Sequence, residues 1–215
     1  MNGHPGGHPG AGHPGEGHPG DVFARQYAAG TAPWDIGRPQ PEMVALEVAG
    51  VFGHRVLDVG CGKGALSIYL AELGHEVLGI DGAELAIDDA RYAAAEKKVD
   101  AVFVLGDVIQ VMGQISDAFD AVVDVGFFHA LDDDAREQFV MQLARVLKPG
   151  GVYAMLAFSE RVPGAFGPRR VSSDEILETF GGSQWQIREL RPAELHSAME
   201  RMPVVDANLA VVERV

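Results

Sequence analysis

The stretch from Arg55 to Gly64, RVLDVGCGKG, constrains the fold more than any other part of the chain. Its branched apolar residues are typical of a buried parallel strand, and the next segment, Ala65 to Ala71, has helical spacing. Between them, Gly60, Gly62 and Gly64 allow a sharp turn and the close approach of a ligand to the backbone. The stretch therefore predicts a strand, a tight turn and a helix that together bind a cofactor.

The charge at the end of this strand discriminates between cofactors. The run from Gly60 to Ala65 satisfies the loose dinucleotide pattern G-x-G-x-x-G/A, and Asp81 follows at the distance expected for a ribose-binding acid. Asp58 stands two residues before the first glycine, however, where an unpaired carboxylate would repel a pyrophosphate. A ligand with a sulfonium or ammonium centre and free ribose hydroxyls fits better, and S-adenosylmethionine (SAM) is such a ligand. The alternative is that Asp58 only caps the following helix.

Length and composition indicate the domain organisation. The 215 residues can form one well-buried domain, with no room for a second catalytic domain beside a full cofactor-binding one. Residues 1–20 contain His-Pro-Gly four times, and so much proline and glycine predicts a disordered tail. Its histidines can bind a transition metal adventitiously, but we expect no functional metal site. The expected domain spans residues 21–215.

Charge and hydropathy disfavour several partners. The formal net charge of −14 and the pI near 4.8 argue against a nucleic-acid substrate, which requires clustered Lys and Arg. The sequence has no uninterrupted apolar stretch of about 18 residues and no signal-peptide pattern, so we expect a cytoplasmic protein that does not enter a membrane. The single cysteine, Cys61, excludes an internal disulfide and is interpreted as a small side chain tolerated in the turn. The sequence does not indicate an oligomeric state.

Patterns of strand and helix alternate along the rest of the chain. Such alternation predicts right-handed crossovers and a mostly parallel, doubly wound sheet with its ligand at the carboxyl ends of the strands. Two closing strands of adjacent sequence can be antiparallel. The expected strands are 55–60, 76–81, 101–106, 119–125, 151–158, 184–190 and 207–214, and the expected helices after the first strand are 63–74, 83–97, 108–115, 133–147 and 174–180.

The segment before the first strand is expected to cover the ligand. Residues 21–33 have the pattern of a short amphipathic helix, and residues 42–52 have that of a helix leading into the first strand. Between them, PWDIGRPQP combines Trp34 with an acid and several prolines in an irregular segment, which is typical of a lid. The alternative is that Trp34 only anchors the N-terminal helix.

Three acids end successive predicted strands. Asp58, Asp81 and Asp107 follow the first, second and third strands, and in a parallel sheet all three point into one crevice. Asp81 can accept both ribose hydroxyls, Asp107 can accept the adenine amino group, and Val108 can offer a backbone N–H to the ring. Each of these acids, taken singly, can be explained as a residue that only caps the following helix. The three together favour SAM over a dinucleotide, which needs only the second acid.

These motifs resemble those of the class I SAM-dependent methyltransferases. VLDVGCGKG looks like the family's first motif, LGIDG like its ribose-binding acid, LGDV like its adenine motif and LKPGG like the turn before its fifth strand. The resemblance covers about residues 23–215 and implies a Rossmann-like α/β fold, with seven strands in the order 3-2-1-4-5-7-6 and the seventh antiparallel. It implies a SAM site made of Trp34, Asp58, Gly60, Cys61, Gly62, Gly64, Asp81, Gly82, Asp107, Val108, Asp124, Val125 and Gly126.

Two further stretches carry a narrower resemblance. PWDIGRPQP and DVGFFHAL resemble the small-molecule branch that contains thiopurine, halide/thiol and tellurite methyltransferases, and look closest to mycobacterial enzymes that methylate hydroxyquinolones and related heterocyclic toxins. This implies transfer of a methyl group from SAM to an O, N or S atom of a small aromatic or heterocyclic molecule. The connection over residues 191–206 is shorter than expected for this branch, and the chain ends at Val215 within the last predicted strand, so the acceptor stays open.

The chemistry requires mainly alignment of a nucleophile with the sulfonium methyl group and exclusion of water. Trp34 and Phe127 are candidate aromatic faces for the sulfonium. His129 is a candidate general base, with Tyr27 in reserve, but His129 can instead pack or orient the substrate. The candidates for an apolar acceptor pocket are Phe127, Phe128, Phe166, Met199 and Met202, of which Phe166 and the methionines can equally be packing residues.

Two other functions remain open. One is a SAM-binding protein without transferase activity. The other is a nicotinamide-dependent oxidoreductase, which Asp58 and the missing second domain disfavour. Calorimetry with SAM, S-adenosylhomocysteine and NAD, followed by a turnover assay with methyl acceptors, would distinguish these functions.

Overall fold

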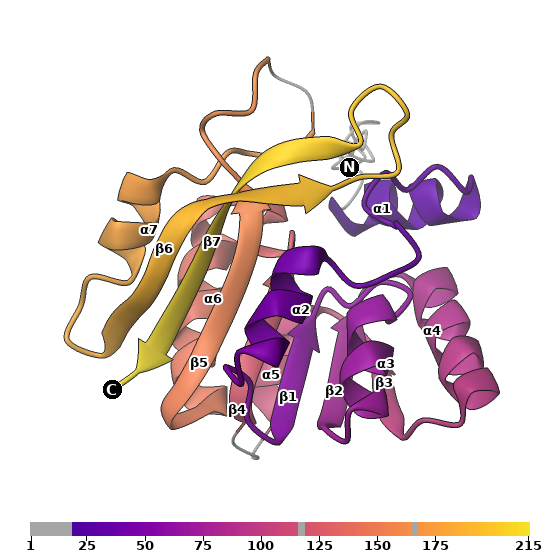
Figure 1. Ribbon diagram of the computed structural model, residues 1–215, viewed down its shortest axis with the longest axis horizontal. Coiled ribbons are helices and arrows are strands. Elements are labelled where there is room, and N and C mark those ends of the chain that lie inside the picture. The colour runs from indigo at the N-terminus through magenta and orange to yellow at the C-terminus, as the bar shows by residue number, and fades with distance from the viewer. Residues whose placement is uncertain (1–18, 116–118, 165–166) are drawn as a thin grey trace, which may run out of the picture.

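One mixed sheet of seven strands, with helices on both faces, forms the protein in a computed structural model (Figure 1). The structure describes residues 19–115, 119–164 and 167–215. In chain order, the elements are α1 Pro19–Ala28, α2 Pro41–Val48, β1 Arg55–Val59, α3 Ala65–Glu72, β2 Glu76–Asp81, α4 Glu84–Lys97, β3 Ala101–Leu105, α5 Val108–Gln114, β4 Phe119–Val125, the 3-10 helix η1 Phe128–Ala130, α6 Asp133–Val146, β5 Leu147–Phe158, α7 Ser173–Thr179, β6 Trp185–His196 and β7 Val204–Arg214.

The strand order confirms the predicted fold. It is β3-β2-β1-β4-β5-β7-β6, in which β7 is antiparallel to both of its neighbours and the strands from β3 to β5 are parallel. The order reverses between β1 and β4, and in open α/β sheets such a reversal leaves a crevice at the carboxyl ends of the strands.

Each face of the sheet is covered by its own group of helices. One core cluster joins α2 and α3 to the sheet, and another joins α5, α6 and α7 to the opposite face. A smaller cluster packs α4 against α3 and β3. Side chains that anchor these helices are Met43, Leu46, Leu66 and Leu70 on the first face and Met112, Phe139, Leu143 and Ile176 on the second. No helix among the described residues is long and apolar enough to cross a membrane.

The last two strands are longer than the sequence pattern predicted. The segment 191–206, expected as a connection, is strand up to His196 and again from Val204. Ala193 and Leu195 are buried and alternate with exposed residues, which is the period of a strand. Pro192 is tolerated because β6 lies at the edge of the sheet.

The fifth strand also begins earlier than predicted. Leu147 pairs with Phe119, and the next sheet partner is Val152, which pairs with Ala121. The Lys-Pro-Gly-Gly turn therefore lies inside β5 as an irregularity and does not precede it.

Helix α1 begins at Pro19, inside the segment 1–20 that was expected to be a tail. Residues 1–18 lie outside the described residues. Helix α1 and the connection between β6 and β7 lie at the same end of the molecule as the carboxyl ends of the parallel strands (Figure 1). Helix α1 and the connection between β6 and β7 thus lie at the end of the sheet that carries the glycine-rich turn.

Candidate active site

Aromatic side chains from other segments lie close to two glycines of the glycine-rich turn. Gly62 has a φ of +54°, and a Cβ at this position would lie 2.5 Å from Oη of Tyr27. A Cβ on Gly60, which has a φ of +66°, would lie 3.1 Å from the ring of Phe127. Because residues with a Cβ rarely adopt such a backbone conformation and would also crowd these neighbours, glycine is favoured at both positions.

A cleft lies between this turn and the N-terminal segment. Six of the residues predicted to bind the cofactor line it, and so does Tyr27. The lining consists of Tyr27, Trp34, Asp35, Ile36, Gly37, Arg38, Pro39 and Gln40 from the N-terminal segment, and of Asp58, Gly60, Cys61, Gly62, Lys63, Ala65, Leu66 and Val125 from β1, the turn, α3 and β4. A second hollow of about 300 Å³ at the other end of the sheet contains none of the predicted site residues.

Asp58 is buried at the base of the cleft. Its Oδ2 accepts a hydrogen bond of 2.5 Å from Oγ of Ser67 on α3. Burial raises the pKa of Asp58 to about 7, and the carboxylates of Asp124 and Asp81 add to this, whereas the bond from Ser67 opposes it. A cationic ligand in the cleft would favour the ionised form.

Asp81 connects β2 to the glycine-rich turn. Its Oδ2 accepts the N–H of Gly62 and its Oδ1 accepts that of Ala83, both at 2.8 Å. Because each carboxylate oxygen has two lone pairs, both oxygens can still accept a ribose hydroxyl. Gly82 is exposed beside it. Cys61 is half-buried, and desolvation raises the pKa of its thiol, which agrees with a passive role in the turn.

Asp107 caps helix α5. Its Oδ1 accepts the N–H of Gln110 at 2.8 Å, while its side chain remains exposed. Val108 begins the helix with its side chain buried. Capping of a helix is the alternative role that the sequence leaves open for each of the three acids. A contact between Asp107 and adenine stays a prediction.

Asp124 supports the end of β4 and does not line the cleft. It is fully buried, and its oxygens accept hydrogen bonds from the N–H groups of Phe127 and Phe128 and from the hydroxyl of Tyr153 at 2.7–3.0 Å. The structure therefore places this carboxylate in the turn after β4, beside Gly126, and its contact with a cofactor stays a prediction. Gly126 has a φ of +87° and allows the chain to bend there.

His129 is held as a neutral side chain. Its Nδ1 accepts the backbone N–H of Phe158 at 3.1 Å, so that the proton of the neutral ring resides on Nε2. Burial lowers the pKa of His129 to about 3, helped by the nearby charges of Arg136 and Arg170. With its lone pair already engaged, His129 is better suited to packing or to donating a hydrogen bond than to the predicted role of general base.

Tyr27 and Trp34 form one aromatic unit with Phe23. The indole Nε1 of Trp34 donates a 2.8 Å hydrogen bond to Oη of Tyr27, and the Trp34 ring packs edge-on against both neighbours at 5.2 and 5.7 Å. Burial raises the pKa of Tyr27, which keeps it a neutral phenol and disfavours its reserve role as a base. Trp34 both packs against α1 and lines the cleft, and its role as a lid over the ligand stays a prediction.

The predicted acceptor-pocket residues separate into different environments. Phe128 is only 1% exposed and packs against Phe139 and Phe180, so the structure places it in the core and not in an open pocket. Phe127 is half-buried beside the turn. Met199 and Met202, on the connection between β6 and β7, are half-buried and pack against the core on the α2 side. Phe166 lies outside the described residues.

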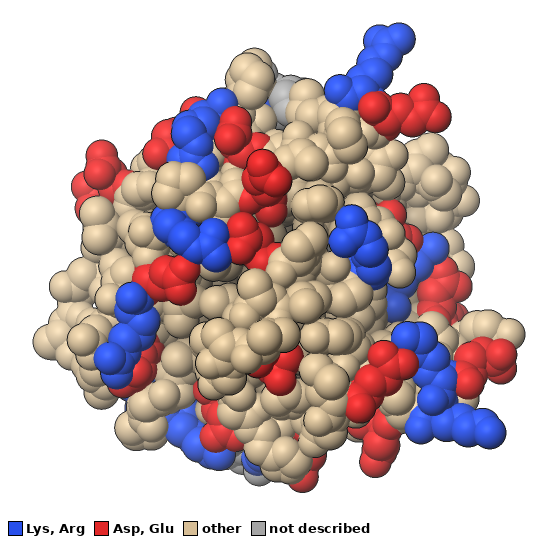
Figure 2. All heavy atoms as spheres, viewed as in Figure 1, with Lys and Arg blue, Asp and Glu red and all other residues tan. Residues whose placement is uncertain are grey.

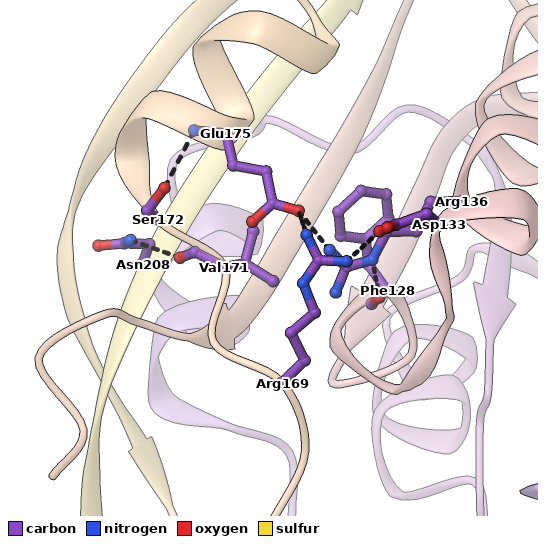
Figure 3. Close-up of polar contacts among 8 residues, drawn as sticks. All are labelled: Phe128, Asp133, Arg136, Arg169, Val171, Ser172, Glu175 and Asn208. Carbon is purple, nitrogen blue, oxygen red and sulfur yellow. Dashed lines mark hydrogen bonds and ion pairs between the residues drawn. The ribbon is translucent and has the colours of Figure 1, made fainter. Parts of the chain in front are cut away.

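A buried cation fixes Phe128 in this position (Figure 3). The guanidinium of Arg136 lies 4.7 Å from the centre of the Phe128 ring, and its Nε donates a hydrogen bond to the Phe128 carbonyl. Glu175 on α7 pairs with both Arg136 and Arg169. This network links η1, α6 and α7.

Sequence reasoning missed several residues that shape the cleft. Lys63 in the glycine-rich turn lies 3.3 Å from Asp35 and 3.1 Å from Asp89, and so it ties the N-terminal segment to α4. Gln40 is 4% exposed and bonds to the backbone of His196. A lysine between the glycines was visible in the sequence, but nothing local identified its partners.

Comparisons with known proteins agree with this geometry. Residues 56–151 match the family model described as a methyltransferase domain. The 2-heptyl-1-hydroxyquinolin-4(1H)-one methyltransferase of Mycobacteroides abscessus is 34% identical over 177 residues, which are 81% of this chain and 77% of that protein.

Solved structures show the same fold. A structure from work on the conversion of a disulfide bond into a thioacetal group during echinomycin biosynthesis matches with a TM-score of 0.81 and 30% identity, over 92% of this chain and 93% of that one. The 1,6-didemethyltoxoflavin-N1-methyltransferase of Burkholderia thailandensis, solved with S-adenosylhomocysteine, matches with a TM-score of 0.72 at 19% identity, over 91% of this chain and 86% of that one.

Proposed function

The chain belongs to the class I SAM-dependent methyltransferases, and we propose that its acceptor is a small aromatic heterocycle with an acidic hydroxyl group or an ionisable ring nitrogen. SAM supplies a methyl group on a sulfonium centre, which is already electrophilic and leaves a neutral thioether. The protein therefore has to bind the two reactants, align them and exclude water.

The residues of the cleft fit SAM. The glycine-rich turn presents backbone without side chains, and a Cβ on Gly62 would fill the space below Tyr27. Asp58 offers a buried carboxylate at the base of the cleft, and both oxygens of Asp81 retain a lone pair for a ribose hydroxyl. Trp34 adds an aromatic ring at the opening, which suits a cationic ligand.

One observation carries the proposal for the acceptor: the predicted bases are not free to accept a proton. His129 has its Nδ1 occupied by the Phe158 N–H, and burial keeps Tyr27 protonated. The buried acid Asp124, which was not one of the predicted bases, also has its oxygens occupied by backbone and Tyr153 donors. An acceptor that ionises by itself needs none of these groups, and acidic hydroxyls on heterocycles meet this condition.

The similar proteins and the surface charge support a small heterocycle. The relative from Mycobacteroides abscessus is named for a hydroxyquinolone, and the likeness extends over most of both chains. On the face shown in Figure 2, lysines and arginines are interspersed with acids, an arrangement that does not favour a phosphate backbone.

The proposal is tested with a panel of acceptors and mass-spectrometric detection of the methylated product. Hydroxyquinolones and N-hydroxy heterocycles are expected to be methylated, and the pH at which the rate is half-maximal is expected to shift with the pKa of each acceptor. The proposal would be contradicted if only thiols were methylated. It would also be contradicted if acceptors of different pKa shared the same dependence of rate on pH.

A substitution of His129 gives an independent test. In His129→Asn, the side-chain oxygen can replace Nδ1 as the acceptor for the Phe158 N–H, so the fold is retained. We expect turnover to fall by less than about tenfold, whereas removal of a general base typically costs about 10²–10⁴-fold. A loss of the larger size in a folded variant would restore His129 as the base.

A further inference from the structure

The imidazole of His129 is fixed in one orientation just after the carboxyl end of β4. Its Nδ1 accepts the backbone N–H of Phe158 at 3.1 Å, and its ring packs edge-on against the Phe158 ring with 5.0 Å between the centroids. Because Nδ1 is the acceptor, the proton of the neutral ring lies on Nε2. His129 therefore presents one N–H donor whose direction is set by the protein before any ligand binds.

This donor is open to the crevice. No described residue accepts a hydrogen bond from Nε2, and although His129 is only 8% exposed, Nε2 is not one of the fully buried atoms without a partner. Gly126 lies directly beside it, and a Cβ at that position would lie 3.0 Å from Nε2 and 3.1 Å from Cε1. The preceding residue, Val125, lines the cleft. Glycine at position 126 thus keeps Nε2 accessible beside the cleft.

The charges around the ring favour an anion as its partner. Those that act on His129 belong to Arg136 on α6 and to Arg170 on the loop after β5, and both oppose protonation of the ring. Nη2 of Arg136 is itself buried and has no hydrogen-bond partner among the described residues. A neutral imidazole with cations near it can donate its N–H to an anion, while it is poorly able to accept a proton.

We propose that Nε2 of His129 donates a hydrogen bond to an oxygen of the ionised acceptor, so that the site selects the anion over the neutral molecule. The acceptor loses its proton to solvent before methyl transfer, so no base on the protein is required. His129 is then a catalytic residue that binds and orients the nucleophile. The inference rests on the proposed function, because it requires an acceptor that ionises by itself.

The test is the pKa of a hydroxyquinolone bound to the complex of the protein with S-adenosylhomocysteine, followed by absorbance, in which the ionised and neutral forms differ. In wild type this pKa is expected to lie about 1 or more below that of the free compound, which means at least about tenfold tighter binding of the anion. The buried acids Asp58, Asp81 and Asp124 also have raised pKa values, but absorbance reports only the acceptor.

Three variants assign the effect to its donor. His129→Leu removes the N–H and is expected to lose most of the lowering of the acceptor pKa. His129→Asn is expected to keep most of it, because its carboxamide can accept the Phe158 N–H and still donate. His75→Leu removes a half-buried histidine just before β2, at the other end of the sheet, and is expected to behave as wild type. All three variants retain the same buried acids.

The proposal would be overturned if wild type methylated the hydroxyquinolone but left its bound pKa unchanged, a result that depends on no variant. An unchanged lowering in a His129→Leu protein that still melts cooperatively would also overturn it, and so would an equal loss in His75→Leu. A hydroxyquinolone that neither binds nor is methylated would contradict the proposed function as well. Methylation without the lowered pKa contradicts this proposal alone.

Discussion

The strongest test of the site is the pH dependence of SAM binding to Asp58→Asn. Asp58 is buried beneath the cleft, and its pKa in the unliganded protein is raised to about 7. A cationic ligand favours the ionised carboxylate, so binding should lower this pKa and release a proton. Affinity for SAM is therefore expected to rise as the pH increases through about 7.

The size of the effect follows from linkage. If the pKa falls from about 7 in the free protein to 5 or less in the complex, the dissociation constant is about tenfold larger at pH 6 than at pH 8, or about 1.4 kcal/mol. In Asp58→Asn we expect this slope to flatten. We also expect affinity at pH 8 to be roughly 10–100-fold weaker, because a charged acceptor is lost.

The assay is calorimetry with SAM from pH 6 to pH 8, in two buffers of different ionisation enthalpy, so that proton release is measured directly. Asp81 and Asp124 are near enough to Asp58 for their charges to raise its pKa, and burial raises the pKa of each of them as well. The comparison with Asp58→Asn separates their contribution. A flat profile in wild type, or the same slope in both proteins, would refute the assignment.

The same substitution has an expected effect on stability. Because the pKa of Asp58 in the folded protein is raised above its ordinary value of 3.8, this group contributes stability below about pH 4 that is lost as the pH rises through about 7. Unliganded Asp58→Asn is therefore expected to melt at a higher temperature than wild type at pH 8, although it binds SAM less well. Thermal melts at pH 5 and pH 8 measure this difference.

Three further predictions test other parts of the structure. Asp81→Ala is expected to weaken SAM binding by about 2–4 kcal/mol in calorimetry, since two ribose hydroxyls lose a charged acceptor; undiminished affinity would remove Asp81 from the site. The fluorescence change on adding SAM is expected to disappear in Trp34→Phe and to persist in Trp185→Phe, and the reverse would place the cofactor away from Trp34. Glu175→Gln, which leaves the buried Arg136 without its charged partner, is expected to lower the free energy of unfolding in urea by about 3 kcal/mol. Asp133→Asn, which breaks the exposed pair with Arg169 and leaves the pair between Arg136 and Glu175 in place, is expected to cost less than about 1 kcal/mol, and equal losses would contradict this reading of the network.

The order of the strands was predictable because the motifs at the strand ends resemble those of a family whose strand order is known. Each acidic motif ends a short apolar strand and is followed by a helix, and this alternation predicts a mostly parallel sheet with right-handed crossovers. The extent of β6 and β7 was not predictable in the same way. Pro192 breaks the local strand pattern, and only the position of β6 at the sheet edge makes it acceptable.

The contacts of the N-terminal segment depend on tertiary structure. PWDIGRPQP predicted an irregular covering segment, and Trp34 does line the cleft. The partner of Gln40 and Arg38 is His196, which is more than 150 residues away along the chain. The alternation of Arg38, Gln40 and Glu42 between prolines was a local signal for an extended segment, but it did not identify the strand beside it.

The different positions of Asp58 and Asp124 follow from strand register. Asp58 pairs with Val123 and with Gly79, whereas Asp124 pairs with Val59. Because paired residues share a face and successive residues alternate, Asp58 and Asp124 lie on opposite faces of the sheet. Asp81, two residues after Gly79, shares the face of Asp58. Asp124 instead shares the face of Tyr153 and is bonded to its hydroxyl within the core. An acid at a strand end can reach the crevice only if its register also directs it to the correct face, so motif position alone could not separate a carboxylate that faces the cleft from one that supports the turn.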